Sequence, residues 1–533
     1  MRRVLALVLA AGVLAGCAGA TEAPENTERL TIAIHEDRGP VNLFAGVSEP
    51  LAELVYDKLV APSPYVAEPT PWLATAVRAV DPTTWEADLR PDVTWHDGTP
   101  FGVNDVVFTF RYMREAPTGR WTHHVADIPT VTATAVDADT VRFTCAFACP
   151  ELGDVTLADL PIIPEHVWAA VPPQDAKKVT ALPVGTGPYR LVAYAPGNGY
   201  RFEANERYFA GPPQVAALEV PVIEDPSTTF TALRTGEIDA TFRPLAPELV
   251  DQFGGGSGGI EVIRTAPYQF PEMRINYERA PYDVPEVRRA ISRAIDKEQL
   301  STVVGLGRAR PALQGYPHPD SPHTAPGLST PFDATEAAAL LDAAGVRDTD
   351  GDGVREIASG PLRPAILVNA AFPADVRAAE LAAEDLGKVG IAATVEGVDA
   401  GTLTDRNTKR EFDLQVGTIT AHGVADPDQF IMSHRSGYLW KAPTIPYPEF
   451  DALFEQWRAA STNDARRDVS FQMQQLFNRQ PTSVPLYYPD EYYAVRADRY
   501  AGWMESPGFG VVHKWSLLPG QVSRDAGAVV AAR

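Results

Sequence analysis

The chain has 533 residues, of which 45% are apolar and 22% are charged. This balance is typical of a soluble globular protein and excludes a disordered or membrane-embedded one, and the length predicts several structural units. The 46 basic and 69 acidic side chains leave a net charge of −23, which repels phosphate backbones and excludes a general nucleic-acid binder.

The N-terminus has the pattern of a secretory signal. Two arginines precede an apolar run that ends at Leu14 and is too short to span a bilayer. The following Ala-Gly-Cys resembles the end of a bacterial lipobox, which predicts removal of residues 1–16, acylation of Cys17 and a polar tether over residues 17–29. The alternative is an ordinary signal peptide with an incidental cysteine. Acylation predicts an extracytoplasmic protein that lipid holds on the cell membrane.

Cys145 and Cys149 are the remaining pair of cysteines, four positions apart. Disulfides persist outside the cytoplasm, so the pair predicts a small-loop disulfide. Two separate buried cysteines are the alternative. A zinc site is disfavoured because no second Cys or His pair has zinc-finger spacing.

The first half of the chain predicts short strands separated by proline and glycine. Asp97-Gly98 indicates a tight turn, and Asn104 is the expected cap of a helix that reaches Met113. A further helix ends at Gly236 and leads into a strand. Predicted strands cover residues 30–34, 84–89 and 141–145.

The second half predicts longer helices. Asp283 with Glu286, and Asp333 with Glu336, have capping-box spacing. Strand-like residues 364–370 and 391–398 flank a predicted helix over residues 375–389 that stops at Gly390. Such a βαβ unit requires two parallel strands and a right-handed crossover. A helix over residues 464–478 and strands within residues 484–495 complete the expected elements.

Six motifs in order then resemble one family. They begin at Trp95 (WHDGTPF…DVVF), Pro164 (PEHVW), Gly185 (GTGPY), Asn205 (NERYFAGPP), Leu233 (LRTGEIDA) and Asn276 (NYERAPYDVPEVRRAISRAIDKEQL). In this order they resemble the extracytoplasmic solute-binding proteins of ABC transporters, family 5, which includes peptide- and nickel-binding proteins. The resemblance covers nearly the whole mature chain. We expect Gly185 and Gly187 to adopt backbone angles that a Cβ opposes, and Trp95 and Phe101 to belong to the core. Arg288 and Arg289 are expected on a solvated or lobe-bridging helix face.

The resemblance implies an α/β fold with two lobes, a periplasmic-binding-protein-like fold of the cluster C type with an extra subdomain in the first lobe. The implied division is lobe I over residues 30–70 and 181–271, the extra subdomain over 71–180, lobe II over 272–488, and a return to lobe I over 489–533. The chain is expected to cross between the lobes near residues 268–276 and 486–495.

The function that the resemblance implies is a receptor, not an enzyme. A monomer binds a small ligand, with a peptide or peptide-like molecule favoured, and delivers it to ABC permease subunits without a required cofactor. Metal chelates, opines and sugars are alternative ligands. More distant alternatives are a surface lipoprotein for signalling or adhesion, and a serine hydrolase. The hydrolase pattern is Gly255 to Gly259 around Ser257, but a helix-like segment precedes it and a strand-like segment follows, the reverse of a nucleophile elbow.

The ligand region departs from the peptide-binding pattern of the family. Gly423 stands where relatives place the Asp that pairs with the peptide ammonium group, and Thr420 stands where they place a Trp. His422 is a candidate ligand donor or metal contact, with an exposed loop histidine as the alternative. Asp426 could take over the role of that Asp only by a shift of the loop. Tyr438, Trp440 and Trp503 are candidate aromatic walls of the ligand site, and each of them could instead pack in the core.

Asp348, Asp350 and Asp352 resemble the start of a calcium loop. An EF-hand needs a bidentate Glu at the twelfth position, where Ser359 stands. Bound calcium and an unoccupied carboxylate-rich turn are the two interpretations.

Overall fold

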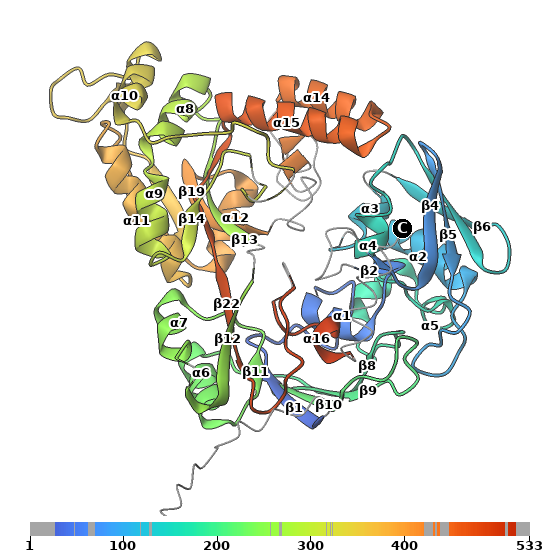
Figure 1. The fold of residues 1–533 in the computed structure, drawn as a ribbon. Coiled ribbons are helices and arrows are strands. Elements are labelled where there is room, and N and C mark those ends of the chain that lie inside the picture. Colours follow the sequence, from blue (N-terminus) through green and yellow to red (C-terminus); the bar gives the residue numbers. More distant parts are fainter. Residues whose placement is uncertain are drawn as a thin grey trace, which may run out of the picture.

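The computed structural model describes most of the chain beyond the N-terminal segment. Described are residues 27–46, 48–61, 70–117, 119–126, 130–255, 257–265, 269–315, 317–319, 321, 323–420, 430–431, 434–436, 447–506 and 510–518. Within these residues, no helix is both long enough and apolar enough to cross a bilayer. The described chain forms two lobes, and a pair of strands runs between them (Figure 1).

Lobe I is built on a five-stranded mixed sheet in the order β11-β1-β10-β9-β8. Strand β1 is parallel to β10 and β11, whereas β10, β9 and β8 are antiparallel neighbours. The bounds are β1 Thr27–Ala33, β8 Tyr189–Ala195, β9 Gly199–Ala204, β10 Val215–Pro221 and β11 Ala240–Thr241. Three helices of this lobe are α1 (Glu49–Val55), α6 (Pro226–Thr235) and α7 (Pro247–Phe253).

An extra subdomain is inserted into lobe I between α1 and β8. Its antiparallel sheet has the order β4-β5-β7-β6, and α2 packs on β6 and β7. The bounds are β4 Ala74–Asp81, β5 Thr84–Leu89, α2 Val103–Glu115, β6 Val131–Ala135 and β7 Thr140–Cys145. Its shorter elements are α3 His123–Ala126, α4 Thr156–Asp159, α5 Glu165–Trp168 and the 3₁₀ turn Pro173–Lys178. Before the subdomain, β2 (Val60–Ala61) and β3 (Thr70–Pro71) form a separate two-stranded sheet.

Lobe II is built on a second five-stranded sheet in the order β18-β17-β19-β13-β20. Strands β17 and β18 are parallel and α11 connects them, so the predicted βαβ unit is confirmed. The strand bounds are β13 Gln269–Ile275, β17 Ala365–Asn369, β18 Thr394–Val398, β19 Leu414–Thr420 and β20 Ser483–Pro485. The helix bounds are α8 Pro285–Ala294, α9 Lys297–Val304, α10 Ala334–Ala343, α11 Pro373–Gly387, α12 Ala400–Lys409, α14 Pro448–Ala459 and α15 Asn463–Arg479.

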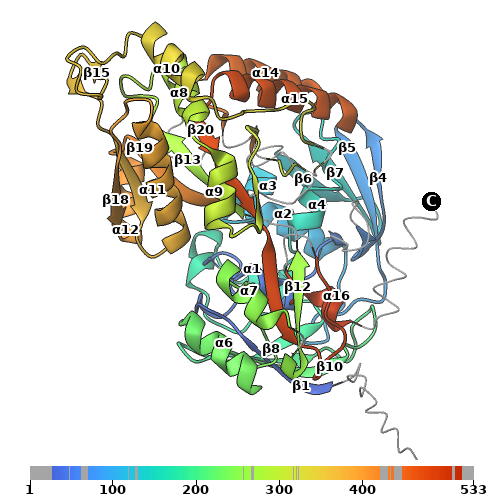
Figure 2. The same cartoon turned by 60° about the vertical axis from the view of Figure 1, so that its left-hand side comes forward.

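The hinge consists of β12 (Ile260–Thr265) and β22 (Glu491–Arg496), which pair antiparallel along their whole lengths. Figure 2 shows this pair running between the two lobes. The chain passes into lobe II between Thr265 and Gln269, and it returns after β21 (Tyr487–Pro489), which pairs with β14 (Ala309–Pro311). A last short helix, α16 (Lys514–Leu517), lies in lobe I.

Two predicted helix caps and one predicted surface residue are wrong. Helix α2 begins after Gly102 rather than Asn104, because Asp105 accepts the Gly102 amide at 3.0 Å. Helix α8 begins after Val284, so the Asp283 box does not form, whereas Asp333 does cap α10. The Arg288 side chain is buried and donates at 2.7 Å to the carbonyl of Pro481, which also lies in lobe II, so it lies on neither a solvated nor a lobe-bridging face.

Three of the six family-like motifs, those that begin at Trp95, Pro164 and Gly185, contact one another in lobe I and act as scaffold. Asp105 accepts the indole N–H of Trp95 at 3.2 Å and the Glu165 amide at 2.9 Å, which joins two motifs. His96 Nδ1 accepts the Gly185 amide, and its Nε2 donates to the Gly187 carbonyl at 3.0 Å, which joins a third. Trp95 and Phe101 are buried as predicted.

The glycines of the third motif serve close packing and not unusual backbone angles. Neither Gly185 nor Gly187 has a positive φ, so that part of the prediction is wrong. A Cβ on Gly187 would lie 2.5 Å from the carbonyl oxygen of Leu54, at the end of α1. The motif therefore needs glycine because helix α1 lies directly against it.

Candidate functional site

The inner edges of both lobes are formed by the carboxyl ends of parallel strands. In lobe I, β11 ends beside the hinge, where the Leu245 amide donates to the Tyr492 carbonyl of β22. In lobe II, β19 ends at Thr420, which pairs with Gln269 at the first position after the crossing. In open α/β sheets, ligands bind outside the carboxyl ends of such strands. The space between the lobes beside the hinge is therefore the candidate ligand site.

Most of the ligand residues predicted from the sequence follow directly on β19. His422, Gly423 and Asp426 lie outside the described residues, and so do Tyr438 and Trp440. Their roles stay predictions. The described chain does place the start of this segment, Thr420, at the lobe II edge of the candidate site.

Trp503 is the one predicted aromatic wall within the described residues. Its ring belongs to the lobe I core, is 9% exposed and meets Tyr500 edge to face at 5.3 Å. Its indole Nε1 is buried and has no hydrogen-bond partner among the residues that the structure describes. The segment that carries it also contacts the hinge, because Ser506 accepts the Thr265 hydroxyl at 3.3 Å. Trp503 is thus a core residue with one unused donor, and a buried unpaired donor requires an explanation.

Asp375 is a residue at the candidate site that the sequence reasoning did not single out. It lies in the first turn of α11, is buried, and accepts the hydroxyl of Thr418 at 3.3 Å near the end of β19. Burial raises the pKa of Asp375, and the hydrogen bonds from Thr418 oppose that rise. A carboxyl group at this edge is therefore easier to protonate than an exposed aspartate. The only sequence signal was an acidic residue at a helix start, which is common at helix N-termini for structural reasons.

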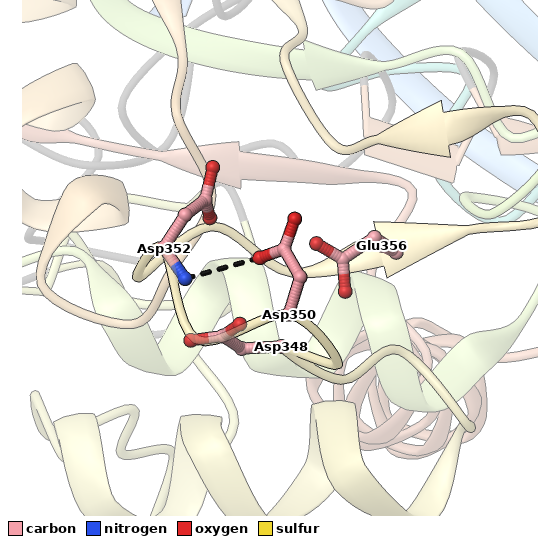
Figure 3. A group of neighbouring side chains, drawn as sticks. All are labelled: Asp348, Asp350, Asp352 and Glu356. Carbon is pink, nitrogen blue, oxygen red and sulfur yellow. Dashed lines mark hydrogen bonds between the residues drawn. The ribbon is translucent and has the colours of Figure 1, made fainter.

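The predicted calcium-loop residues come together on lobe II, before the short strands β15 (Glu356–Ile357) and β16 (Gly360–Pro361). One carboxylate oxygen from each of Asp348, Asp350, Asp352 and Glu356 lies within 4.8 Å of the others (Figure 3). Sequence reasoning missed Glu356, although it is the ninth residue counted from Asp348. A β-hairpin follows the loop where an EF-hand has a helix, so an EF-hand is excluded.

The carboxylates of this loop also accept hydrogen bonds from its own backbone. Asp348 accepts the amides of Gly351 and Gly353 at 2.7 and 3.0 Å, and Glu356 accepts the Thr349 amide. The same carboxylates therefore cap the turn's own backbone amides, and calcium binding stays a prediction. Calorimetric titration of chelator-treated protein with calcium decides it, and no heat would contradict it.

The predicted disulfide is present in the structure. Cys145 and Cys149 are bonded at the end of β7. The indole N–H of Trp85 donates to the Cys149 carbonyl at 3.0 Å, which fixes the loop against β5. Ser257, by contrast, follows α7 and precedes β12, so the helix–turn–strand order does not form a nucleophile elbow.

Comparison with known proteins supports the receptor reading of this architecture. Residues 68–441 match the profile of "Bacterial extracellular solute-binding proteins, family 5 Middle". The chain is 25% identical over 514 residues to di/tripeptide-binding protein 2 of Pseudomonas aeruginosa, an alignment that covers 91% of this chain and 93% of the relative. It is 29% identical over 366 residues to protein XP55 of Streptomyces lividans, with 66% of each chain covered. The crystal structure of NikZ from Campylobacter jejuni, in complex with Ni(L-His), has the same fold, with a TM-score of 0.77 at 21% identity over 92% of this chain and 97% of NikZ.

Proposed function

Because this chain belongs to the bacterial extracellular solute-binding proteins of family 5, which serve ABC transporters, we propose that its solute is a short peptide or a peptide-like molecule. The observation that carries the proposal is the match along 91% of the chain to a di/tripeptide-binding protein. The fold does not choose the ligand, because NikZ binds a nickel chelate on the same architecture.

The proposed mechanism is a shift between open and closed lobes. The hinge pair β12 and β22 is narrow, so the lobes can rotate about it, and a ligand that contacts both inner edges stabilises the closed form. The closed form then docks on the ABC permease and releases the solute. Solution scattering with and without added tripeptides measures this closure, and an unchanged radius of gyration with every bound peptide would contradict it.

The identity of the solute is best tested without assuming it. Native purification followed by mass spectrometry of the released small molecules should yield short peptides. Recovery of a metal chelate, an opine or a sugar would replace the peptide proposal and would leave the receptor class unchanged.

The proposed peptide mode does not depend on a free amino group. Gly423 carries no carboxylate at the position where peptide-binding relatives hold the ammonium group, so N-acetylated tripeptides should bind about as well as unmodified ones. Isothermal titration of matched pairs measures the difference. A strict requirement for a free amine would show that Asp426 or another carboxylate takes over the role.

His422 is the proposed polar contact to the ligand. Loss of one hydrogen bond costs about 1 kcal/mol, so His422→Ala should weaken peptide affinity by at least that amount. The same titrations measure this variant, and an unchanged dissociation constant would place His422 outside the ligand site.

Lipid anchoring at Cys17 is a further part of the proposal. In the wild type, the protein should fractionate with membranes and carry acyl chains on its N-terminal cysteine. Cys17→Ser should release it into the soluble extracytoplasmic fraction, because no other anchor is predicted. Recovery of the variant in the membrane fraction would contradict a lipid anchor.

A further inference from the structure

The lobes meet at a second place, away from the hinge. Figures 1 and 2 both show α14 and α15 of lobe II extending toward the four-stranded sheet of the extra subdomain. Arg466 of α15 forms an ion pair with Glu151 of the subdomain and donates to the carbonyl of Ala148. One charged side chain of lobe II therefore binds two groups of lobe I.

The contact is buried and has an aromatic component. Arg466 is only 4% exposed, and its guanidinium lies 4.0 Å from the ring centroid of Trp457 within its own lobe. Arg458 of α14 lies over the ring of Phe147 at 5.2 Å. Burial raises the pKa of Glu151, and the charge of Arg466 opposes that rise, which indicates that the contact removes the carboxylate from water.

The lobe I side of the contact is held rigid by covalent chemistry. Phe147 and Ala148 both lie inside the small ring that the disulfide between Cys145 and Cys149 closes. Trp85 binds the Cys149 carbonyl from the neighbouring strand. The Ala148 carbonyl is thereby presented in one orientation, which lowers the entropy cost of the contact with Arg466.

A pocket of about 360 Å³ beside this contact is lined from both lobes. Trp85, Pro82 and Pro150 line it from the subdomain, and Thr462 and Asn463 line it from the turn between α14 and α15. The surfaces of the two lobes thus approach each other next to the ion pair without filling all the space. A partly filled interface of this kind can separate without unfolding either lobe.

We propose that Arg466 and the disulfide-closed loop of residues 145–149, together with Glu151, form a latch that favours lobe closure. Arg466 is in this sense a positioning residue for ligand capture and does not touch the ligand. Because of the latch, a fraction of the molecules is closed before any ligand binds. This raises the apparent affinity, because the ligand contacts the inner edges of both lobes only in the closed form. The inference rests on the proposed function in one respect: it assumes that the lobes open and close when the protein binds its ligand.

The test measures the distance between the lobes in the absence of ligand. Spin labels on Val136→Cys in the subdomain and Val303→Cys on α9 use two exposed positions on opposite lobes. Pulsed electron spin resonance on the full mature chain, dialysed free of small molecules, should give a short-distance population in the otherwise wild-type protein. Arg466→Met should reduce the ratio of closed to open molecules by about threefold or more.

The matched control is Arg467, the next residue on the same helix. Arg467 pairs with Asp464 of its own helix at 2.8 Å, so Arg467→Met should leave the distance distribution unchanged. Arg466→Lys keeps the positive charge, so its closed population should lie between that of Arg466→Met and that of the wild type. Replacing both Cys145 and Cys149 by Ser should reduce closure in the same direction as Arg466→Met, while the far-ultraviolet circular dichroism stays that of the wild type.

Two outcomes would overturn the latch. One is a distance distribution that is the same for the wild type and Arg466→Met, including the case in which neither has a closed population. The other is an equal loss of closure in Arg467→Met, which would indicate a general charge effect. Neither outcome bears on the ligand, because no ligand is present, so a failed latch leaves the receptor proposal intact.

Discussion

The hinge and the latch join the same two lobes by different kinds of contact. At the hinge, β12 and β22 are paired along a continuous backbone ladder from Ile260 opposite Arg496 to Thr265 opposite Glu491. At the latch, side chains make the contacts, chiefly that of Arg466, with the Ala148 carbonyl as a backbone acceptor. A ladder keeps the lobes together in every state, whereas a few side-chain contacts can be broken and remade. The backbone ladder is therefore expected to set the axis of the lobe motion, and the side-chain contacts to set how far the equilibrium lies toward the closed form.

The same contrast appears between two buried arginines. Arg288 donates within lobe II to the carbonyls of Pro481, Tyr282 and Asp283. Arg466 is equally buried, but its partners are divided between the lobes: Glu151 and the Ala148 carbonyl lie in lobe I, whereas the Trp457 ring lies in its own lobe. On the proposed opening, Arg466 loses its two lobe I partners, whereas the three acceptors of Arg288 stay with it in lobe II. Burial alone therefore does not predict how much a charged residue contributes to stability.

The largest expected effect on stability comes from a buried network that lies wholly within lobe I. Asp57 is fully buried and accepts from Trp72 at 2.8 Å, Tyr208 at 3.0 Å and Lys514 at 3.3 Å. Asp57→Ala leaves the Lys514 cation buried without this counter-charge and should lower the free energy of unfolding by about 3–5 kcal/mol. Urea denaturation measures the change. A loss below about 1 kcal/mol would mean that this network does not hold the C-terminal return in lobe I.

Arg288→Met should have the next largest effect. It removes three hydrogen bonds from a charged donor to buried carbonyls while keeping the volume, so we expect a loss of about 3 kcal/mol in unfolding free energy. The exposed neighbour Arg289, which pairs with Glu336, is the control, and Arg289→Met should change stability by less than about 1 kcal/mol. Equal effects of the two variants would contradict the role of Arg288 inside the lobe.

Acid should destabilise lobe I through two histidines. Burial lowers the pKa of His96 and of His513 to about 4, from an ordinary value of 6.5. Between pH 6.5 and pH 4 the unfolded chain binds protons that the folded chain does not, so stability is complete above this window and falls as the pH falls through it. We expect a loss of about 3 kcal/mol for each histidine by pH 4.

Denaturation curves at pH 7, 5.5 and 4.5 measure this slope. His96→Gln keeps a donor for the Gly187 carbonyl and removes the titrating group, so its stability should vary less with pH than that of the wild type. An identical pH dependence of the two proteins would show that His96 does not control the transition.

The smallest expected effect on stability is at the latch. Arg466→Met should lower the free energy of unfolding by less than about 1 kcal/mol, because the open form already gives up the contact without unfolding. Thermal unfolding of the ligand-free protein measures it beside Arg288→Met. A loss as large as that of Arg288→Met would make Arg466 a structural residue, and the distinction between the two arginines would disappear.

Particular elements illustrate how far the sequence predicted the fold. The βαβ unit around α11 followed from apolar periodicity and from Gly390, which has a φ of +85°. The stop of α6 at Gly236 and the cap of α10 by Asp333 followed from local signals in the same way. The Asp283 cap failed because Pro285 is the first helical residue of α8 and Val284 precedes it, so the capping side chain stands one position too early.

The candidate site was less accessible to sequence reasoning. Three of the motifs that identified the family bind one another, as His96 binds Gly185 and Gly187, which explains their residues by packing in lobe I. Glu356 joins the acidic loop through a hairpin turn that the calcium-loop pattern did not include. Arg466 has no distinguishing neighbours in the chain, and its partners Ala148 and Glu151 are more than 300 residues away.

The sequence by itself determined the compartment signal, the local elements and the family, because these depend on short-range periodicity, turn chemistry and motif order. Only the tertiary structure decided which buried charged side chains have all their partners in their own lobe and which bind groups of the other lobe. The physical reason is that the contribution of a charged side chain to stability depends on whether its partners stay in place when the lobes move. The separation of the partners along the chain does not indicate this.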